Sequence, residues 1–165
     1  MAVRKILLMG EDALRKKCRV VDNFDARLHT LLDDMAETMR HAEGAGLAAP
    51  QVGILRRVVV IEASDEENEA VLELINPEFL MQEGAQINPE GCLSIPGKRM
   101  TVERPEKVRV RALNRDGEEY EIEAEGFMAT ALCHELDHLD GILYVDKMIE
   151  DVTDQYQQEE EEQEQ

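Results

Sequence analysis

One short segment of the sequence carries the residue types of a metal site: His134-Glu135-Leu136-Asp137-His138. On a helix, residues four positions apart lie one turn apart on the same face, so both imidazoles can reach one metal ion. Glu135 can turn toward the same cavity and take a proton from water at the metal. The alternatives are a chance pattern or two hydrogen-bonded core histidines. The spacing favours a metal-binding helix.

A catalytic metal site needs a third protein ligand and one position left open for water. A third histidine six residues after His138, as in one large group of zinc proteases, is absent because Tyr144 stands there. Cys92 is the better candidate, because the preceding Gly91 allows the backbone to approach a metal closely. A thiolate is also a strong ligand for zinc or ferrous iron. We therefore predict Cys92 as the third ligand.

A third unusual segment is Gly44-Ala45-Gly46-Leu47-Ala48-Ala49-Pro50-Gln51. Its two glycines and small side chains let a backbone come close to a ligand, although Gly-Ala-rich turns after helices are also common. The segment lacks the spacing and the lysine of a phosphate-binding loop. We expect it to offer an extended edge to a peptide, with the Gln51 amide placed to polarise a carbonyl.

The elements around these segments are helices and short strands. Apolar residues recur every three or four positions and predict an amphipathic helix over about 25–42. These residues are Leu28, Leu31, Leu32, Met35 and Met39. Strand-like segments follow at 57–62, 71–76, 107–113 and 119–125. A late helix carries the two histidines and is followed by Gly141. This order predicts an α+β fold in which mostly antiparallel strands surround a buried C-terminal metal-binding helix, with an N-terminal amphipathic helix.

Length, charge and cysteine usage exclude several classes of protein. A chain of 165 residues with 43% hydrophobic residues fits one domain with a real core. No apolar run is long enough for a transmembrane helix, and the N-terminal apolar stretch is too short for a signal peptide, so we expect a cytoplasmic protein. A net charge of −19 argues against binding nucleic acid or an anionic membrane. Three cysteines, Cys18, Cys92 and Cys133, predict reduced thiols rather than disulfides.

In this order and with their flanks, the segments GAGLAAPQ, EGCLS and HELDH closely resemble the three characteristic motifs of peptide deformylases. The likeness includes IPGKR after the cysteine and runs from near the N-terminus to about residue 148. Cys133 stands where many family members have glutamine. The resemblance implies a catalytic domain over residues 1–148. It also implies a hydrolase that removes the N-formyl group from the N-terminal methionine of nascent polypeptides and releases formate.

The resemblance also implies a role for each motif residue. It places the metal on Cys92, His134 and His138, with water in the fourth position. The family is associated with Fe(2+) in the cell, with Zn(2+) or Ni(2+) as substitutes in many preparations. Glu135 would activate the water and then pass its proton to the leaving nitrogen. Gln51 and the backbone N–H of Leu93 would donate hydrogen bonds to the oxyanion.

Six residues are expected to contact the substrate: Ala45, Gly46, Arg99, Phe127, Thr130 and Ala131. The first two lie in the glycine-rich segment and would pair with the peptide backbone as in strand addition. The aliphatic stem of Arg99 would form a wall. The last three lie one to two turns before His134 and would form the methionine pocket. For each of the six, plain core packing is the alternative.

Asp137 is the one acid whose position calls for a structural partner. It lies in the last turn of the metal helix, where the helix dipole disfavours a carboxylate. We therefore expect it to be buried and paired with Arg104, which would hold the metal helix in place. The alternative is an acid that faces solvent.

Residues 149–165 are expected to form an acidic C-terminal tail outside the matched region. Eight acids and no Lys or Arg lie between residues 150 and 165, which indicates a solvated, poorly folded end. Deformylases often end in a C-terminal helix, sometimes basic, that is thought to aid docking on the ribosome. The ribosome is therefore a candidate partner, but a tail this acidic does not suit that docking mode.

Two other functions compete with the deformylase interpretation. One is a metal amidase that uses the same site on a different acyl group, and the other is a structural metal site in a protein-binding module. A structural site is normally closed by four protein ligands, and the sequence offers three good ones. Nothing in the sequence indicates a large apolar interface, so we expect a monomer.

Overall fold

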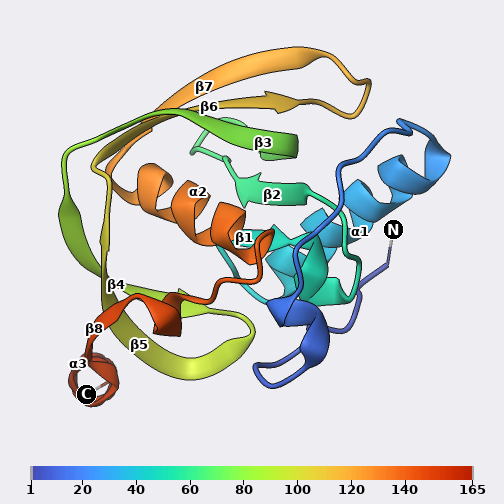
Figure 1. Ribbon diagram of the computed structural model, residues 1–165. Helices are drawn as coiled ribbons and strands as arrows, with labels where there is room; N and C mark the ends of the chain where they lie inside the picture. Colours follow the sequence, from blue (N-terminus) through green and yellow to red (C-terminus); the bar gives the residue numbers. More distant parts are fainter. Residues whose placement is uncertain (1, 165) are drawn as a thin grey trace.

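The fold is built from two β-sheets with a helix between them, and the computed structural model describes residues 2–164 (Figure 1). The larger sheet has the strand order β1-β2-β3-β6-β7. Its strands are β1 Gly46–Ala48, β2 Val58–Glu62, β3 Val71–Glu83, β6 Lys107–Leu113 and β7 Glu119–Glu125. The smaller sheet, in the order β4-β5-β8, contains β4 Gln86–Cys92, β5 Ile95–Arg104 and β8 Met148–Asp151. Every pair of these strands is antiparallel, as predicted.

Strand β2 shows how the larger sheet is covered on both faces. Because side chains alternate along a strand, Val58 and Val60 pack with the apolar residues of helix α1, whereas Val59 and Ile61 pack with those of helix α2. All four side chains are buried. The sheet is therefore a layer between two helices, which confirms the predicted α+β class.

Helix α1 spans Ala26–His41, close to the predicted range. It begins where the Asp25 carboxylate accepts a hydrogen bond from the Leu28 N–H over 3.1 Å. After the helix, the left-handed conformation falls on Glu43, with φ of +56°, rather than on the glycine that follows. The Gly44 N–H donates to the Met39 carbonyl, so the chain turns directly from the helix into the glycine-rich segment.

Helix α2, Gly126–His138, lies between the two sheets and carries both histidines of the predicted metal site (Figure 1). Nine of its 13 residues are buried. Gly141 follows it with φ of +74°, and a Cβ there would meet the Arg15 carbonyl oxygen at 2.6 Å. Only glycine suits that turn, so the predicted end of the metal helix is confirmed.

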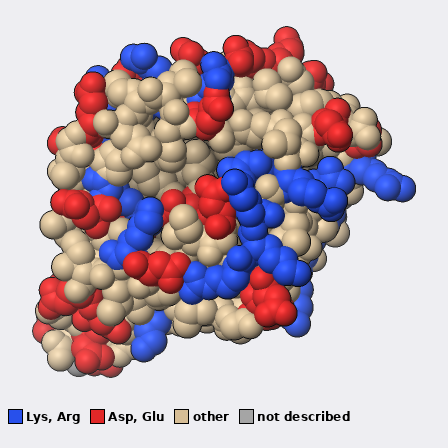
Figure 2. Space-filling view, in the orientation of Figure 1, with Lys and Arg blue, Asp and Glu red and all other residues tan. Residues whose placement is uncertain are grey.

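The C-terminal region differs from the sequence prediction. Strand β8 pairs with β5, and helix α3 follows over Thr153–Gln163, so a poorly folded tail is wrong for these residues. Backbone hydrogen bonds to β5 supply the order that the acidic side chains do not. The acids themselves remain solvated, and Figure 2 shows them gathered at the lower left, where Figure 1 places α3. The division at residue 148 stays a prediction, and β8 crosses it.

Three short 3-10 helices complete the described elements: η1 Asp12–Arg15, η2 Ala49–Val52 and η3 Tyr144–Asp146. Within residues 2–164, the helices are all too short or too polar to span a bilayer.

Candidate metal centre and active site

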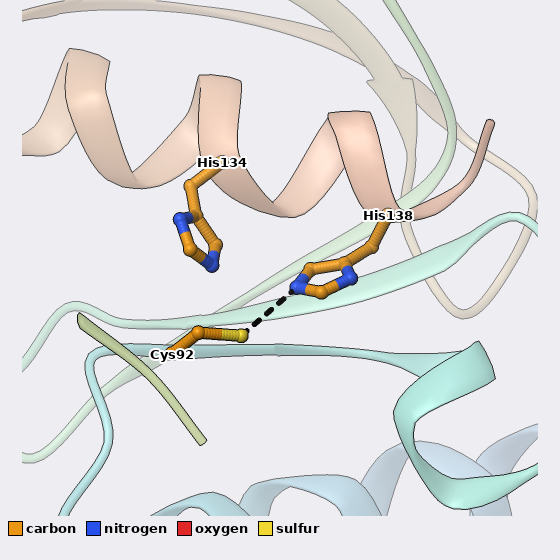
Figure 3. Close-up of side chains that lie close together, drawn as sticks. All are labelled: Cys92, His134 and His138. Atoms are coloured by element: carbon orange, nitrogen blue, oxygen red, sulfur yellow. Dashed lines mark hydrogen bonds between the residues drawn. The ribbon is translucent and has the colours of Figure 1, made fainter. Parts of the chain in front are cut away.

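Strand β4 and helix α2 bring three ligand-type side chains together. Cys92 is the last residue of β4, and His134 and His138 lie one turn apart on α2 (Figure 3). One ligand atom from each lies within 4.8 Å of the others, and the Cys92 Sγ is 3.5 Å from the His138 Nε2. All three residues are buried. The geometry is that of a cluster able to hold one metal ion.

The donor set fits a catalytic metal. Thiolate and imidazole ligands suit zinc and ferrous iron, and three protein ligands leave a coordination position free. Burial lowers the pKa of His138 well below its usual value, which favours the neutral imidazole. No other group of three such side chains is this close together among residues 2–164.

Glu90 orients the first histidine, a role that the sequence analysis missed. The His134 Nδ1 lies 2.8 Å from the Glu90 Oε1, so the ring nitrogen that faces the cluster is Nε2. Arg104 donates to both oxygens of Glu90, over 2.9 and 3.0 Å. Burial alone would raise the pKa of Glu90, but the hydrogen bonds from His134 and Arg104 hold it below its usual range. The signal available in the sequence was an acidic residue two positions before Cys92.

Asp137 joins the same network from the back of α2. The Arg104 Nη1 donates to the Asp137 Oδ2 over 2.7 Å, and the Lys147 Nζ lies 3.0 Å from the same oxygen. The predicted pairing with Arg104 is therefore present, although the Asp137 side chain is partly exposed rather than fully buried. Arg104 therefore links Asp137 of helix α2 to Glu90, which orients the predicted metal ligand His134.

Glu135 is placed to handle a proton. Its side chain is buried, and its Oε2 has no hydrogen-bond partner among residues 2–164. Burial raises the pKa of Glu135 to about 7. A Cβ at position 46 would lie 2.8 Å from the Glu135 Cγ, so Gly46 provides the space that this side chain occupies.

Gln51 is held rigidly beside the sulfur. Its Oε1 accepts a hydrogen bond from the Ala48 N–H over 2.9 Å, and its Nε2 donates to the Ser94 Oγ over 3.1 Å. The same Nε2 lies 3.8 Å from the Cys92 Sγ. Ser94 is a second residue that the sequence analysis did not single out. Leu93 follows the cysteine and packs against Gly44, where a Cβ would come within 2.6 Å of it.

A cavity of about 690 Å³ opens onto Cys92, His134 and Glu135. All six residues predicted to contact a substrate line it: Ala45, Gly46, Arg99, Phe127, Thr130 and Ala131. Leu93 also lines it, whereas Gln51 and His138 are buried beside the Cys92 sulfur and are not among the lining residues. Tyr156, from the segment predicted to be a tail, is a further lining residue.

The other two cysteines lie away from the cavity. Cys18 and Cys133 are both buried in the apolar cluster that includes residues of α2. Burial raises the pKa of each thiol to about 11. Neither sulfur belongs to the metal cluster.

Comparison with known proteins agrees with this site. The chain matches the family described as polypeptide deformylase over residues 3–154. It is 56% identical over 151 residues to a peptide deformylase from Alkaliphilus metalliredigens, covering 92% of this chain and 100% of that protein. The chain belongs to the polypeptide deformylase family. Another deformylase, from Acetivibrio thermocellus, is 58% identical over 149 residues, which are 90% of this chain and 85% of that protein.

Solved deformylase structures share the fold. A peptide deformylase from Legionella pneumophila gives a TM-score of 0.86 at 45% identity, over 90% of this chain and 87% of that one. A deformylase from Thermotoga maritima gives 0.84 at 37% identity, over 90% and 99%. Family membership makes this chain an enzyme, a metal-dependent hydrolase, and the resemblance stated from the three motifs is confirmed.

Proposed function

We propose that this deformylase site removes the N-formyl group from the N-terminal methionine of nascent polypeptides, releasing formate and a free amino terminus. The observation that carries the proposal is the Glu135 Oε2, which is buried and has no hydrogen-bond partner among residues 2–164. Glu135 lines the cavity that also reaches Cys92 and His134 of the predicted metal cluster. A carboxylate oxygen without a partner, next to three metal ligands, is arranged for proton transfer rather than for structure.

The ligand residues would hold a divalent metal, which supplies a Lewis acid for the formyl oxygen and lowers the pKa of a water. Glu135 takes the proton of the attacking water at its Oε2 and delivers it to the amide nitrogen as the bond to the formyl carbon breaks. Glu90 keeps the His134 ring in one orientation throughout. Among the protein side chains, only Glu135 changes its protonation state during the reaction.

Two donors are proposed for the oxyanion that develops on the formyl oxygen when water adds to the formyl carbon: the Gln51 Nε2 and the Leu93 backbone N–H. The position of Gln51 beside Cys92, with its carbonyl oxygen fixed by Ala48, supports this role. A donor held in place before the reaction costs little reorganisation when the charge develops.

Ala45 and Gly46 are proposed to bind the substrate backbone. Strand β1, which begins at Gly46, stands at the edge of the five-stranded sheet, so one side of it is available for an added strand. Phe127, Thr130 and Ala131 line the cavity one to two turns before His134 and are proposed to surround the methionine side chain.

The proposed metal in the cell is Fe(2+), with Zn(2+) or Ni(2+) as substitutes, because the Cys and His donors suit all three. The substrate arises at the ribosome, so we propose a cytoplasmic enzyme that meets ribosomes and acts as a monomer. The chain's charge of −19 supports a protein partner on the ribosome rather than direct binding to nucleic acid.

Formate release tests the function. Anaerobically purified, Fe(2+)-loaded protein is given a formyl-Met tripeptide and, in parallel, the acetyl-Met tripeptide. We expect formate from the first and no cleavage of the second. Glu135→Gln is expected to keep the metal and lose at least 100-fold in kcat, the scale of general acid–base catalysis. Bound metal without cleavage of either peptide would contradict the proposal, and unchanged activity of Glu135→Gln would contradict the role of Glu135.

A further inference from the structure

Helix α3 contributes a side chain to the catalytic cavity. Tyr156 lies in the first turns of α3 and lines the same cavity as Cys92 and Glu135. It is partly buried, while its neighbours Gln155 and Gln157 are exposed. The C-terminal segment therefore has one face toward the cavity and its acidic faces toward solvent.

Two hydrogen bonds to the backbone of Arg99, a residue of the cavity wall, hold the start of α3. The Val152 N–H donates to the Arg99 carbonyl over 2.9 Å. The Arg99 N–H in turn donates to the Thr153 Oγ1 over 3.0 Å. Because both bonds are made to Arg99, the beginning of α3 is placed relative to this residue, and Tyr156 follows one turn later.

The Arg99 guanidinium is itself confined. Its Cζ lies 5.7 Å from the centroid of the Tyr156 ring, a cation–π distance. A Cβ at Gly91 would come within 2.7 Å of the same carbon, so the guanidinium occupies the space that this glycine leaves. Its Nη1 also donates to the Lys98 carbonyl over 3.1 Å. These contacts hold a flexible side chain in one place at the cavity.

The charge at this position is distinctive. Among the described residues that line the cavity, Arg99 is the sole Lys or Arg, in a chain with 37 acids. The Arg99 guanidinium lies beside Gly91, the residue before Cys92, and lines the same cavity as Glu135, so a peptide bound in this cavity can meet the cation. An acidic side chain on that peptide would be attracted to it, and a basic one repelled.

We propose that Tyr156 is a positioning residue that holds the Arg99 guanidinium against the substrate residues following formyl-methionine, and thereby favours an acidic over a basic residue there. The inference rests on the proposed function. Tyr156 acts on peptide binding through Arg99 and takes no part in the chemistry.

Kinetics with three substrates test the proposal: formyl-Met-Ala-Glu, formyl-Met-Ala-Lys and formyl-methioninamide, which ends at the methionine. For Tyr156→Ala we expect KM for the glutamate peptide to rise about two- to fivefold, as one exposed cation–π contact implies, with kcat unchanged. KM for formyl-methioninamide stays at the wild-type value. Tyr156→Phe keeps the ring and the wild-type KM, and Gln157→Ala, exposed on the same helix, is the matched control.

A double-mutant cycle separates positioning from direct contact. In an Arg99→Ala background, Tyr156→Ala is expected to change KM no further. Tyr156→Leu keeps apolar packing without a π face and is expected to behave as Tyr156→Ala, which excludes loss of α3 as the cause. An unchanged KM for the glutamate peptide in Tyr156→Ala, or an equal rise for formyl-methioninamide, would overturn the inference. Wild-type protein that releases no formate would instead contradict the proposed function.

Discussion

Ion pairs occur in two contrasting regions of the molecule. Beside the predicted metal cluster, Arg104 forms an ion pair with Glu90, and their side chains are only 3% and 4% exposed. On the β6-β7 hairpin, Lys107 and Arg109 reach Glu123 across the strands, and these three side chains are 37–46% exposed. Both regions pair a basic side chain with a glutamate, but the first pair is buried and the hairpin pairs are exposed to solvent.

Burial decides what each set of charges does. Removing one member of a buried pair leaves a charge without a partner and costs about 3–5 kcal/mol, whereas an exposed pair contributes about 0.2–1 kcal/mol. In the buried pair, Glu90 also forms a hydrogen bond with the His134 Nδ1, so the pair affects the orientation of a predicted metal ligand. The residues of the hairpin pairs do not line the cavity and lie on the exposed surface of the sheet.

The largest effect is expected from Glu90→Met. It leaves the Arg104 charge with less compensation and removes the acceptor of the His134 Nδ1. We expect the free energy of unfolding to fall by about 3 kcal/mol and the metal affinity by about 10- to 100-fold. Urea denaturation and metal titration measure the two quantities.

The double variant Glu90→Met with Arg104→Met is the control for this prediction. Without the buried charge, stability is expected to return toward the wild-type value, while metal affinity stays low because His134 still lacks its acceptor. A double variant with full metal affinity would show that Glu90 does not orient the ligand.

Asp137→Asn is expected to give a smaller change, because Asp137 is partly exposed and Arg104 keeps Glu90 as a partner. We expect a loss of about 1 kcal/mol in the free energy of unfolding, with a weaker decrease in metal affinity than for Glu90→Met. Thermal denaturation and metal content measure the effect. If both match the wild type, the tie between Asp137 and the metal helix is refuted.

The ion pair between Arg40 and Glu62 is intermediate in exposure, at 35% and 29%, and gives a pH-dependent prediction. Hydrogen bonds from Arg40 and Ser64 lower the pKa of Glu62 to about 2. A folded-state pKa below that of the unfolded chain means that the stabilisation is present above about pH 4.5 and is lost as the pH falls toward 2. With solvent screening, we expect Glu62→Gln to cost about 1 kcal/mol at pH 7 and progressively less below pH 5. Denaturant unfolding of both proteins at each pH is the measurement. If the difference in the free energy of unfolding between wild type and Glu62→Gln stays constant from pH 7 to pH 4, the lowered pKa of Glu62 is refuted.

The smallest effect is expected from Glu123→Gln on the exposed hairpin. We expect the free energy of unfolding to change by less than about 0.5 kcal/mol, and by nothing measurable in 0.5 M salt, where exposed charges are screened. Urea denaturation at low and high salt is the measurement. A loss as large as that of Glu90→Met would erase the contrast between the two regions.

The features that the sequence predicted well depend on local periodicity. The spacing of His134 and His138 and the apolar stripe of α1 follow from helix geometry alone, and both helices are present. Cys92 was predicted as the third ligand from its thiol and the preceding Gly91, and the family resemblance implied the same three residues. Helix and strand patterns are local in the sequence, so they could not predict that the end of β4 lies close to α2.

The missed features depend on contacts between distant parts of the chain. Glu90 meets His134 only because strand β4 runs beside α2, 44 residues away in sequence. The acidic composition of the C-terminal segment suggested disorder, yet three of the four residues of β8 pair with β5, and composition does not report such backbone pairing. Tyr156 reaches the cavity as a consequence of that pairing.

The unequal settings of the three sulfur atoms carry a chemical consequence. Cys18 and Cys133 are sealed in the core and remain protonated at neutral pH, because burial raises the pKa of both thiols to about 11. Cys92 faces the cavity, so peroxide or a thiol-directed reagent entering from solvent meets this sulfur first. Because Cys92 is the predicted thiolate ligand, oxidation of this one sulfur would be enough to remove it from the predicted metal site.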